Sequence, residues 1–215
     1  MLFYVIIFYK EVIILHNFSS YMQKVLKKYE NCDEAHGISH IEGVWRRAKD
    51  IRGLVSENVD ERILMTCCYF HDLGNLVNRK EHHLESGKMV LADKELLNFF
   101  SEDEIQLIKE AVEDHRTSLK NEPRNIYGKI LKDADKDDDV KESLYRAYIY
   151  SKEKGLGQNE EEWIESTFAQ LNKKFGKNGS VTYCILDENT SLFIKQMKQL
   201  AEDKIAFYSY MKAII

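Results

Sequence analysis

The sequence predicts an all-α fold organised as a single domain. Its 215 residues include only one proline and ten glycines, so residues that interrupt helices are scarce. Hydrophobic residues make up 44% of the chain, and through most of it they recur every three or four positions, as on one face of a helix. A chain of this length can bury a sizeable core in one domain. At most a short strand or extended loop is expected, near residues 181–186, where apolar residues alternate weakly.

The first half of the chain, up to Pro123, contains five expected helices. Apolar residues that share one face predict these helices over residues 21–30, 38–55, 61–73, 83–92 and 102–115. Capping residues stand near the start of three of them: Ser39, Asp60, and Ser101 with Glu104 as a capping box. The third helix runs into His71 and Asp72 before it stops at Gly74, so this His-Asp pair lies at a helix end.

The second half of the chain is expected to continue the helical pattern. Helices are predicted over residues 127–134, 140–154, 161–175 and from about Thr190 to the end of the chain. Gly176 is the expected stop of the third of these helices. Acidic residues that repel one another lie at the end of the helix predicted over residues 127–134: Asp133, Asp135, Asp137, Asp138 and Asp139.

The N-terminal segment, residues 1–20, is the most apolar part of the chain. Lys10 and Glu11 interrupt its first fifteen residues, and each charge at the centre of a bilayer costs about 2.5–3.5 kcal/mol. We therefore expect no membrane span, and the segment also has no basic leader or small-residue cleavage site. It is then either a strand or helix that packs on the domain, or a translated extension upstream of a start at Met22.

The net charge indicates which class of partner to expect, and the cysteine content indicates the cellular setting. The net charge is −5, which argues against a nucleic acid polymer, because a phosphate backbone requires a dense basic surface. A small phosphorylated molecule is compatible with this charge, since a bound divalent metal can supply the positive charge locally. The four cysteines form no CxxC pair, which favours a reducing, cytoplasmic setting.

Side chains that bind metals stand on four of the expected helices. They are His40, the adjacent His71 and Asp72, His115 and Asp135. Imidazole and carboxylate together suit Mn, Fe, Co, Ni or Zn, and one carboxylate can bridge two such ions. The adjacent His-Asp pair is the most informative of these, because a single helix end can then hold a metal and orient a nucleophilic water.

Three segments resemble, in order and spacing, the signature of the HD superfamily of metal-dependent phosphohydrolases. They are HGISHIE from His36, YFHDLGN from Tyr69 and LKDAD from Leu131. The chain is most similar to small bacterial single-domain HD proteins, and the match covers about residues 32–139. The resemblance implies a helical HD-domain bundle with C-terminal helices over residues 21–215, with the status of residues 1–20 left open.

The resemblance also implies a ligand set and a cofactor. The metal ligands would be His40, His71, Asp72 and Asp135, of which His71 and Asp72 would take part directly in catalysis. Asp72 would bridge two ions if two are bound. The expected cofactor is a divalent metal, as one or two ions of Mn, Fe, Ni, Co, Zn or Mg.

Some HD enzymes have two further histidines that form a second metal site. His83 and His115 stand where these histidines would fall, although His82 competes with its neighbour for the role. The alternative for both positions is a histidine that forms a hydrogen bond with phosphate or with a neighbouring carboxylate. Lys132, Arg116 and Lys80 are candidates for binding the phosphates of a substrate.

The sequence departs from the family pattern at one position. HD proteins commonly have arginine three residues after the first ligand histidine, and Gly43 stands there in this chain. Arg46 or Arg47, one helical turn further on, could take over the phosphate contacts of that arginine.

The function implied by the resemblance is hydrolysis of a phosphoester or phosphoanhydride in a small molecule, with a nucleotide as the usual substrate class. The reaction would proceed by attack of metal-bound hydroxide. Two other functions stay open: a module that senses a nucleotide without turning it over, and a di-iron oxygenase with the fuller six-ligand set. The expected partner is the small phosphorylated substrate, with no nucleic acid polymer and no membrane, and the protein would be a monomer or a homodimer.

Overall fold

The described part of the computed structural model is helical apart from turns and loops, and no strand occurs in it. The structure describes residues 2–30, 32, 37–117, 119 and 121–215, with side chains from residue 13 onward. The all-α fold predicted from the sequence is thus confirmed. Residues 181–186 form an irregular loop, so the loop rather than the strand is the correct alternative there.

The chain divides into two compact units, Met1–Asp135 and Lys136–Ile215. The sequence predicts one domain, whereas the second unit has a hydrophobic core made entirely of its own residues. Length does not distinguish the two arrangements, because domains of roughly 50–200 residues are common. The boundary directly follows Asp135, so every residue predicted to bind metal belongs to the first unit.

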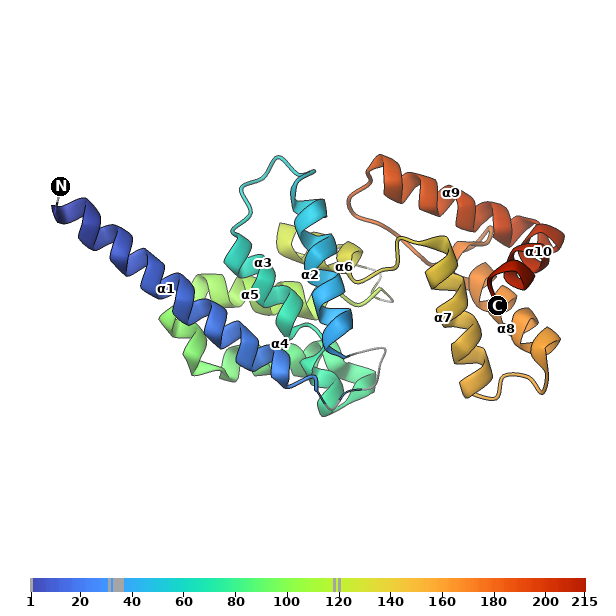
Figure 1. Ribbon diagram of the computed structural model, residues 1–215, viewed down its shortest axis with the longest axis horizontal. Helices are drawn as coiled ribbons and strands as arrows, with labels where there is room; N and C mark the ends of the chain where they lie inside the picture. Colours follow the sequence, from blue (N-terminus) through green and yellow to red (C-terminus); the bar gives the residue numbers. More distant parts are fainter. Residues whose placement is uncertain (1, 31, 33–36, 118, 120) are drawn as a thin grey trace. The chain divides into compact units, whose positions relative to one another are not determined.

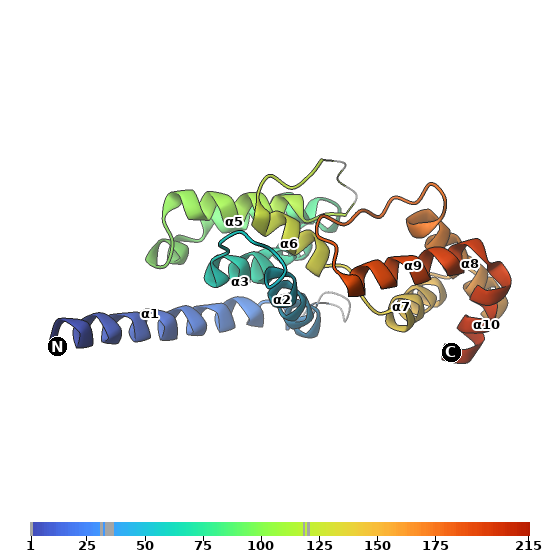
Figure 2. The same cartoon turned by 90° about the horizontal axis from the view of Figure 1, so that it is seen from above.

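A central helix, α3 (Glu61–Phe70), organises the first unit. It contacts the five other α-helices of the unit (Figure 1, Figure 2), namely α1 (Leu2–Lys27), α2 (Ile38–Arg52), α4 (His82–Ala92), α5 (Glu102–Asp114) and α6 (Ile126–Ala134). In the described part of this unit, three short 3₁₀ helices lie between the α-helices: η2 (Leu73–Leu76), η3 (Arg79–Glu81) and η4 (Lys94–Asn98). Because α3 is packed from several sides, its buried residues cover more than one face.

The N-terminal segment forms one continuous helix with the residues that follow it. Helix α1 covers both residues 2–20 and the helix predicted from residue 21 onward. Phe18 lies edge-on against Phe99 and Phe100, with ring centroids 5.4 and 5.8 Å apart, and so anchors this helix on the unit. No helix among the described residues is both long enough and apolar enough to cross a bilayer.

Two of the three predicted caps of the first unit are present. Asp60 accepts hydrogen bonds from the backbone of α3, and Ser101 with Glu104 forms the capping box of α5. Ser39, in contrast, lies inside α2, whose N-cap is Gly37 and makes no side-chain cap bond. The helix begins two residues earlier than a cap at Ser39 requires, so Ser39 lies in its first turn.

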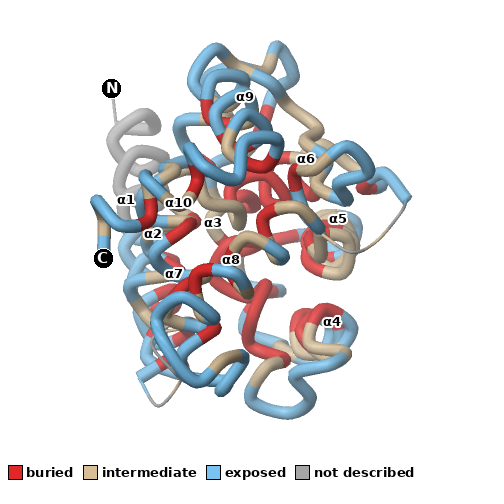
Figure 3. The backbone as a smooth tube through the Cα atoms, turned by 90° about the vertical axis from the view of Figure 1, so that its right-hand side faces the viewer, coloured by how far each residue is buried: buried red, intermediate tan, exposed pale blue. Residues whose placement is uncertain are grey.

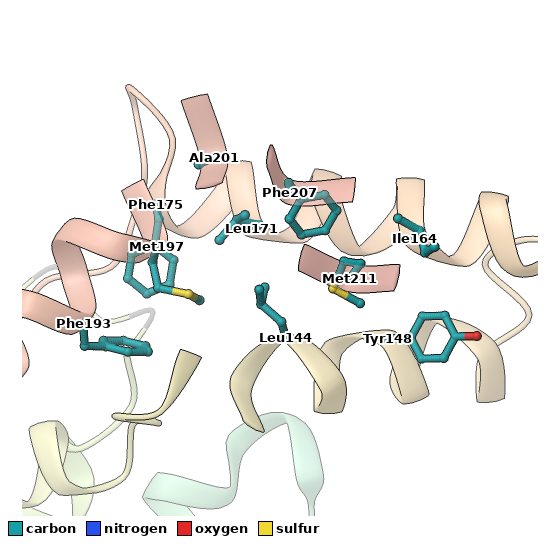
Figure 4. Packing of buried hydrophobic residues seen from close by; sticks show 10 residues of the cluster. All are labelled: Leu144, Tyr148, Ile164, Leu171, Phe175, Phe193, Met197, Ala201, Phe207 and Met211. Carbon is teal, nitrogen blue, oxygen red and sulfur yellow. The ribbon is translucent and has the colours of Figure 1, made fainter. Parts of the chain in front are cut away.

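The second unit is a bundle of four helices, α7 (Val140–Glu153), α8 (Glu160–Phe175), α9 (Glu188–Glu202) and α10 (Lys204–Ile214). Side chains from all four helices point toward one another in its core (Figure 4), including Leu144, Leu171, Met197 and Phe207. Buried and exposed positions alternate along these helices (Figure 3), as expected for amphipathic helices that share one core.

The last helix predicted from the sequence is divided into α9 and α10. Asp203 separates them with a backbone of φ −114° and ψ 94°, and its side chain accepts a hydrogen bond of 2.9 Å from the amide of Ala206. The prediction of one uninterrupted helix was wrong because the apolar spacing continues through the break. An aspartate that caps a new helix was the signal against continuity.

Candidate metal centre

The site begins where α3 ends. His71 is the C-cap of α3, and Asp72 follows with φ −107° and ψ 3°, close to the bridge region in which many active-site residues lie. The chain therefore leaves the α-helical path between these two residues. Because of this change, His71 Nε2 and Asp72 Oδ2 approach to 3.5 Å, although successive residues of a regular helix point in directions about 100° apart.

Two other helices bring His40 and Asp135 to the same place. His40 lies in the first turn of α2, and Asp135 is the C-cap of α6. The Nε2 atom of His40 is 3.2 Å from Asp135 Oδ1 and 3.7 Å from Asp72 Oδ2. The Nε2 atom of His71 is 3.5 Å from Asp135 Oδ1. All four residues predicted as ligands thus converge on one point.

A second group of side chains lies against the other oxygen of Asp72. His82, the first residue of α4, places Nε2 3.5 Å from Asp72 Oδ1, and His115, the C-cap of α5, places Nε2 3.9 Å from the same oxygen. The Nε2 atoms of these two histidines are 3.2 Å apart. Asp72 therefore directs Oδ2 to His40 and His71 and Oδ1 to His82 and His115, so each oxygen of this carboxylate faces a different pair of histidines.

Three of the histidines are oriented in the same way. The Nδ1 atom lies 2.8 Å from the Cys68 carbonyl in His71, 2.6 Å from the Val112 carbonyl in His115, and 3.1 Å from the Arg79 carbonyl in His82. Because a carbonyl oxygen can only accept, Nδ1 must carry the proton in each ring. The lone pair of each Nε2 is then available to a metal ion.

Gly74 allows α4 to come close enough to contribute His82. A Cβ atom at Gly74 would lie 2.0 Å from the His82 carbonyl oxygen and 2.7 Å from the Ser86 amide nitrogen, both of them backbone atoms. The Gly74 amide also donates a hydrogen bond of 2.7 Å to Ser86 Oγ. The glycine two residues after Asp72 thus sets the distance between the two halves of the site.

The residues present fit a metal ion. Three groups of three side chains have ligand atoms within 4.8 Å of one another: His40, His71 and Asp72; His71, His115 and Asp135; Asp72, His82 and His115. The Nε2 atom of His71 is fully buried and forms no well-oriented hydrogen bond among the described residues, although carboxylate oxygens of Asp72 and Asp135 lie 3.5 Å from it. A buried polar atom without a partner is costly, and coordination to a cation removes that cost.

The sequence comparison assigns this helical unit to a family. Residues 37–139 match the family model described as the HD domain, and this range contains every side chain of the centre. The matched segment, which is just under half of the chain, is an HD domain. No curated protein matches it. A solved structure of a predicted HD superfamily hydrolase from an uncultured Thermotogales bacterium is similar, with 20% sequence identity, a TM-score of 0.46, and coverage of 71% of this chain and 85% of that one.

Charges within the HD domain are arranged in favour of a cation. Burial lowers the pKa of His71, but the carboxylates of Asp72 and Asp135 outweigh it and raise this pKa from 6.5 to about 9. Burial and the neighbouring His71 lower the pKa of His115 to about 4. Burial alone would raise the pKa of Asp135, yet His40 and His71 hold it well below 3.8. A proton on His71 therefore compensates the two carboxylates until a metal ion replaces it.

The HD domain brings His82 rather than His83 into the centre. His83, Ser86, Gly87 and Val90 are the buried residues of α4, so His83 lies in the interface of that helix with its neighbours. Among the described residues it belongs to none of the three ligand groups. The spacing of these buried positions in the sequence could have distinguished His83 from His82, because a residue on the apolar face of a helix packs against the neighbouring helices.

The predicted phosphate-binding residues have different surroundings. Arg116, directly after His115, donates a hydrogen bond of 2.7 Å to the Lys80 carbonyl and so connects η3 to the end of α5. The Lys80 side chain is exposed. Lys132 is only 3% exposed, and its Nζ donates to the Leu119 carbonyl at 3.3 Å. Contact of any of the three with phosphate stays a prediction.

Arg47 lies next to Gly43, the position at which HD proteins commonly have arginine. A Cβ atom at Gly43 would be 3.6 Å from Arg47 Nη1, so the guanidinium of Arg47 lies over the glycine. The Nε atom of Arg47 donates a hydrogen bond of 2.6 Å to the Ala134 carbonyl, immediately before Asp135. Of the two arginines predicted to take over, Arg47 is thus the one that the structure places beside the centre.

Proposed function

We propose that this protein is a metal-dependent phosphohydrolase that acts on a phosphoester or phosphoanhydride of a small molecule, with a nucleotide as the expected substrate class. The observation that carries the proposal is the position of Asp72 between two groups of histidines, one at each carboxylate oxygen. Two-metal sites of this kind stabilise both the attacking and the leaving oxygen in a displacement at phosphorus.

The side chains of the metal centre differ in their exposure to solvent, so one side of the centre is buried and the other is open to solvent. The side chains of His71 and His115 are 0% and 1% exposed, whereas those of His82 and Asp135 are 17% and 23% exposed. A substrate would therefore approach from the side of His82 and Asp135. The buried histidines would hold the metal from behind and exclude water from that side.

A divalent metal in this centre would supply two things: it would lower the pKa of a bound water to near 7, and it would polarise a phosphoryl oxygen. The protein holds the ligand side chains and the substrate in position. The hydrogen bonds from Nδ1 to backbone carbonyls keep three imidazoles in the coordinating tautomer, and we expect Arg116 and Lys80 to neutralise further phosphate oxygens. Phosphoryl transfer depends mainly on such positioning and charge neutralisation.

The test is an assay of purified full-length protein with Mn²⁺ and a panel of nucleoside mono-, di- and triphosphates, with identification of the products. We expect release of phosphate or pyrophosphate that stops with a chelator and falls at least a thousandfold in Asp72→Ala. The matched control is Asp50→Ala, since Asp50 lies exposed on α2 away from the centre and should retain wild-type turnover.

The same assay distinguishes the alternative functions. Nucleotide binding without any product in the metal-loaded protein would contradict the hydrolase and favour a sensing module. Tightly bound iron with oxygen consumption would favour an oxygenase, for which six side chains, those of His40, His71, Asp72, His82, His115 and Asp135, are gathered here. Turnover that persists in the presence of a chelator would refute a metal-dependent mechanism altogether.

A further inference from the structure

Tyr29, which lies outside the HD domain, contacts the backbone on both sides of His71. It follows α1 in the chain and precedes residue 37, where the match to the family model begins. Tyr29 is 1% exposed, and its hydroxyl donates a buried hydrogen bond of 2.9 Å to the Tyr69 carbonyl. Burial and the Asp72 carboxylate raise the pKa of Tyr29 well above 10, whereas a hydrogen bond from the Asp72 amide to the same hydroxyl lowers it. One phenol oxygen thus joins the residues before and after His71.

The two backbone groups that meet this hydroxyl lie where α3 ends. The helix stops at Phe70, and the carbonyls of a last helical turn, here including that of Tyr69, have no donor within the helix. Asp72 is already past the helix, with φ −107° and ψ 3°. A phenol hydroxyl can donate one hydrogen bond and accept another, so Tyr29 can satisfy both groups at once.

Helix α1 packs on α3 and so places Tyr29 at the end of that helix. Met22 in α1 is fully buried, and its sulfur lies 3.9 Å from the hydroxyl oxygen of Thr66 in α3. Further along both segments, Tyr29 reaches the carbonyl of Tyr69. The contact between α1 and α3 therefore continues up to the turn from which the metal centre begins.

The direction of the Asp72 carboxylate depends on this turn. Its Oδ2 atom is 3.5 Å from His71 Nε2, and its Oδ1 atom is 3.5 Å from His82 Nε2, so one orientation has to serve both sides of the centre. The Asp72 carbonyl accepts a hydrogen bond of 3.0 Å from the Asn75 amide, and the Asp72 amide donates to Tyr29. The backbone of this residue is therefore held on both sides.

We propose that Tyr29 is a positioning residue of the metal centre, whose hydroxyl holds the turn at Asp72 so that both carboxylate oxygens face their histidines. Phenylalanine at this position would keep the buried ring but would leave two backbone groups without their partner, which is costly inside a protein. The turn would then relax, and the carboxylate would lose its fixed direction. The proposal rests on the proposed function, because Tyr29 acts on the centre that is assigned to catalysis there.

The first test is calorimetric titration of the metal-free, full-length protein with Mn²⁺. Tyr29→Phe should bind Mn²⁺ about tenfold to a hundredfold more weakly than the wild type, the usual effect of removing a residue that supports a metal ligand. The matched control is Tyr127→Phe, since Tyr127 is also buried and its hydroxyl accepts a hydrogen bond of 3.1 Å from the Asp60 amide at the opposite end of α3. This control should keep the wild-type affinity for Mn²⁺. Equal losses of affinity in the two variants would overturn the proposal, because Tyr29 would then act only through the stability of α3.

The second test is hydrogen exchange of the Asp72 amide in the metal-free protein, followed by NMR. In the wild type this amide should exchange about a hundredfold or more slowly than in an unstructured peptide, since it is hydrogen-bonded and buried. Tyr29→Phe should lose most of this protection, and Tyr127→Phe should retain it. An unprotected Asp72 amide in the wild type would overturn the proposal without any variant.

The positioning role and the proposed function can fail separately. Mn²⁺ affinity that depends on Tyr29, in a protein that hydrolyses no phosphoester or phosphoanhydride, would refute the hydrolase and leave the positioning role standing. Wild-type Mn²⁺ affinity in Tyr29→Phe, in a protein that does hydrolyse such a substrate, would overturn the positioning role and leave the hydrolase standing. Absence of Mn²⁺ binding to the wild type would overturn both.

Discussion

Replacement of Gly74 by alanine tests how the two halves of the metal centre are held together. The added Cβ atom would meet the His82 carbonyl oxygen at 2.0 Å and the Ser86 amide at 2.7 Å, and neither backbone atom can rotate away. Overpacking of this kind typically costs 1–3 kcal/mol, and the backbone clash places Gly74→Ala at about 3 kcal/mol or more. For a unit of this size that loss corresponds to a fall in Tm of about 6–12 °C.

The same substitution should disturb metal binding. To relieve the clash, α4 must move away from η2, which separates His82 from Asp72 beyond their present 3.5 Å. We expect Gly74→Ala to bind fewer equivalents of Mn²⁺ than the wild type, measured by equilibrium dialysis with metal analysis, alongside thermal unfolding by circular dichroism.

The matched control for Gly74→Ala is Gly43→Ala in α2. A Cβ atom at Gly43 would have only an ordinary contact of 3.6 Å with Arg47, and alanine inside a helix is favoured over glycine by about 1 kcal/mol. This variant should be as stable as the wild type or more stable. If Gly74→Ala matched the wild type in both Tm and metal content, the close approach of η2 and α4 would not determine the centre.

Three further predictions concern protonation, the second unit and the helix break. In the metal-free protein the pKa of His71 is raised from 6.5 to about 9, so His71 is protonated at pH 7. The affinity for Mn²⁺ should therefore rise roughly tenfold per pH unit from pH 7 to 9 and then level off, and calorimetry in buffers of different ionisation enthalpy should detect the released proton. An affinity that does not change with pH would contradict this prediction. Phe207→Ala should destabilise the second unit by about 3–5 kcal/mol in a urea titration and leave the metal content of the first unit unchanged. Loss of metal in this variant would show that the two units do not fold independently. Asp203→Ala should cost about 1 kcal/mol through loss of the cap on Ala206, whereas Asp203→Asn should retain most of it, and equal effects would exclude a capping role.

The sequence predicts the parts of this protein that depend on local patterns. Apolar spacing and scarce proline indicate the helices, and Asp60 and the Ser101 capping box mark helix starts because a cap requires only a few neighbouring residues. The order of the His, His-Asp and Asp segments also identifies the residues that converge, although their distances come from tertiary packing.

Other features could not be predicted because they depend on contacts between distant residues. The close approach of Gly74 to α4, which brings His82 to 3.5 Å from Asp72, joins residues that no local pattern connects. The division into two units depends on which helices share a core, and apolar spacing on a single helix does not specify its partner. Asp203 was readable as a cap, but continuous apolar spacing across it favoured one helix.

The orientation of the histidines by main-chain carbonyls has a consequence for how the centre tolerates mutation. Cys68, Val112 and Arg79 each hold a ring through an oxygen that every amino acid possesses. Exchange of these side chains therefore leaves the supporting bond in place, provided that the turn keeps its course. Substitutions at these neighbouring positions should therefore leave the histidines in place. Changes that alter the backbone turns should displace them.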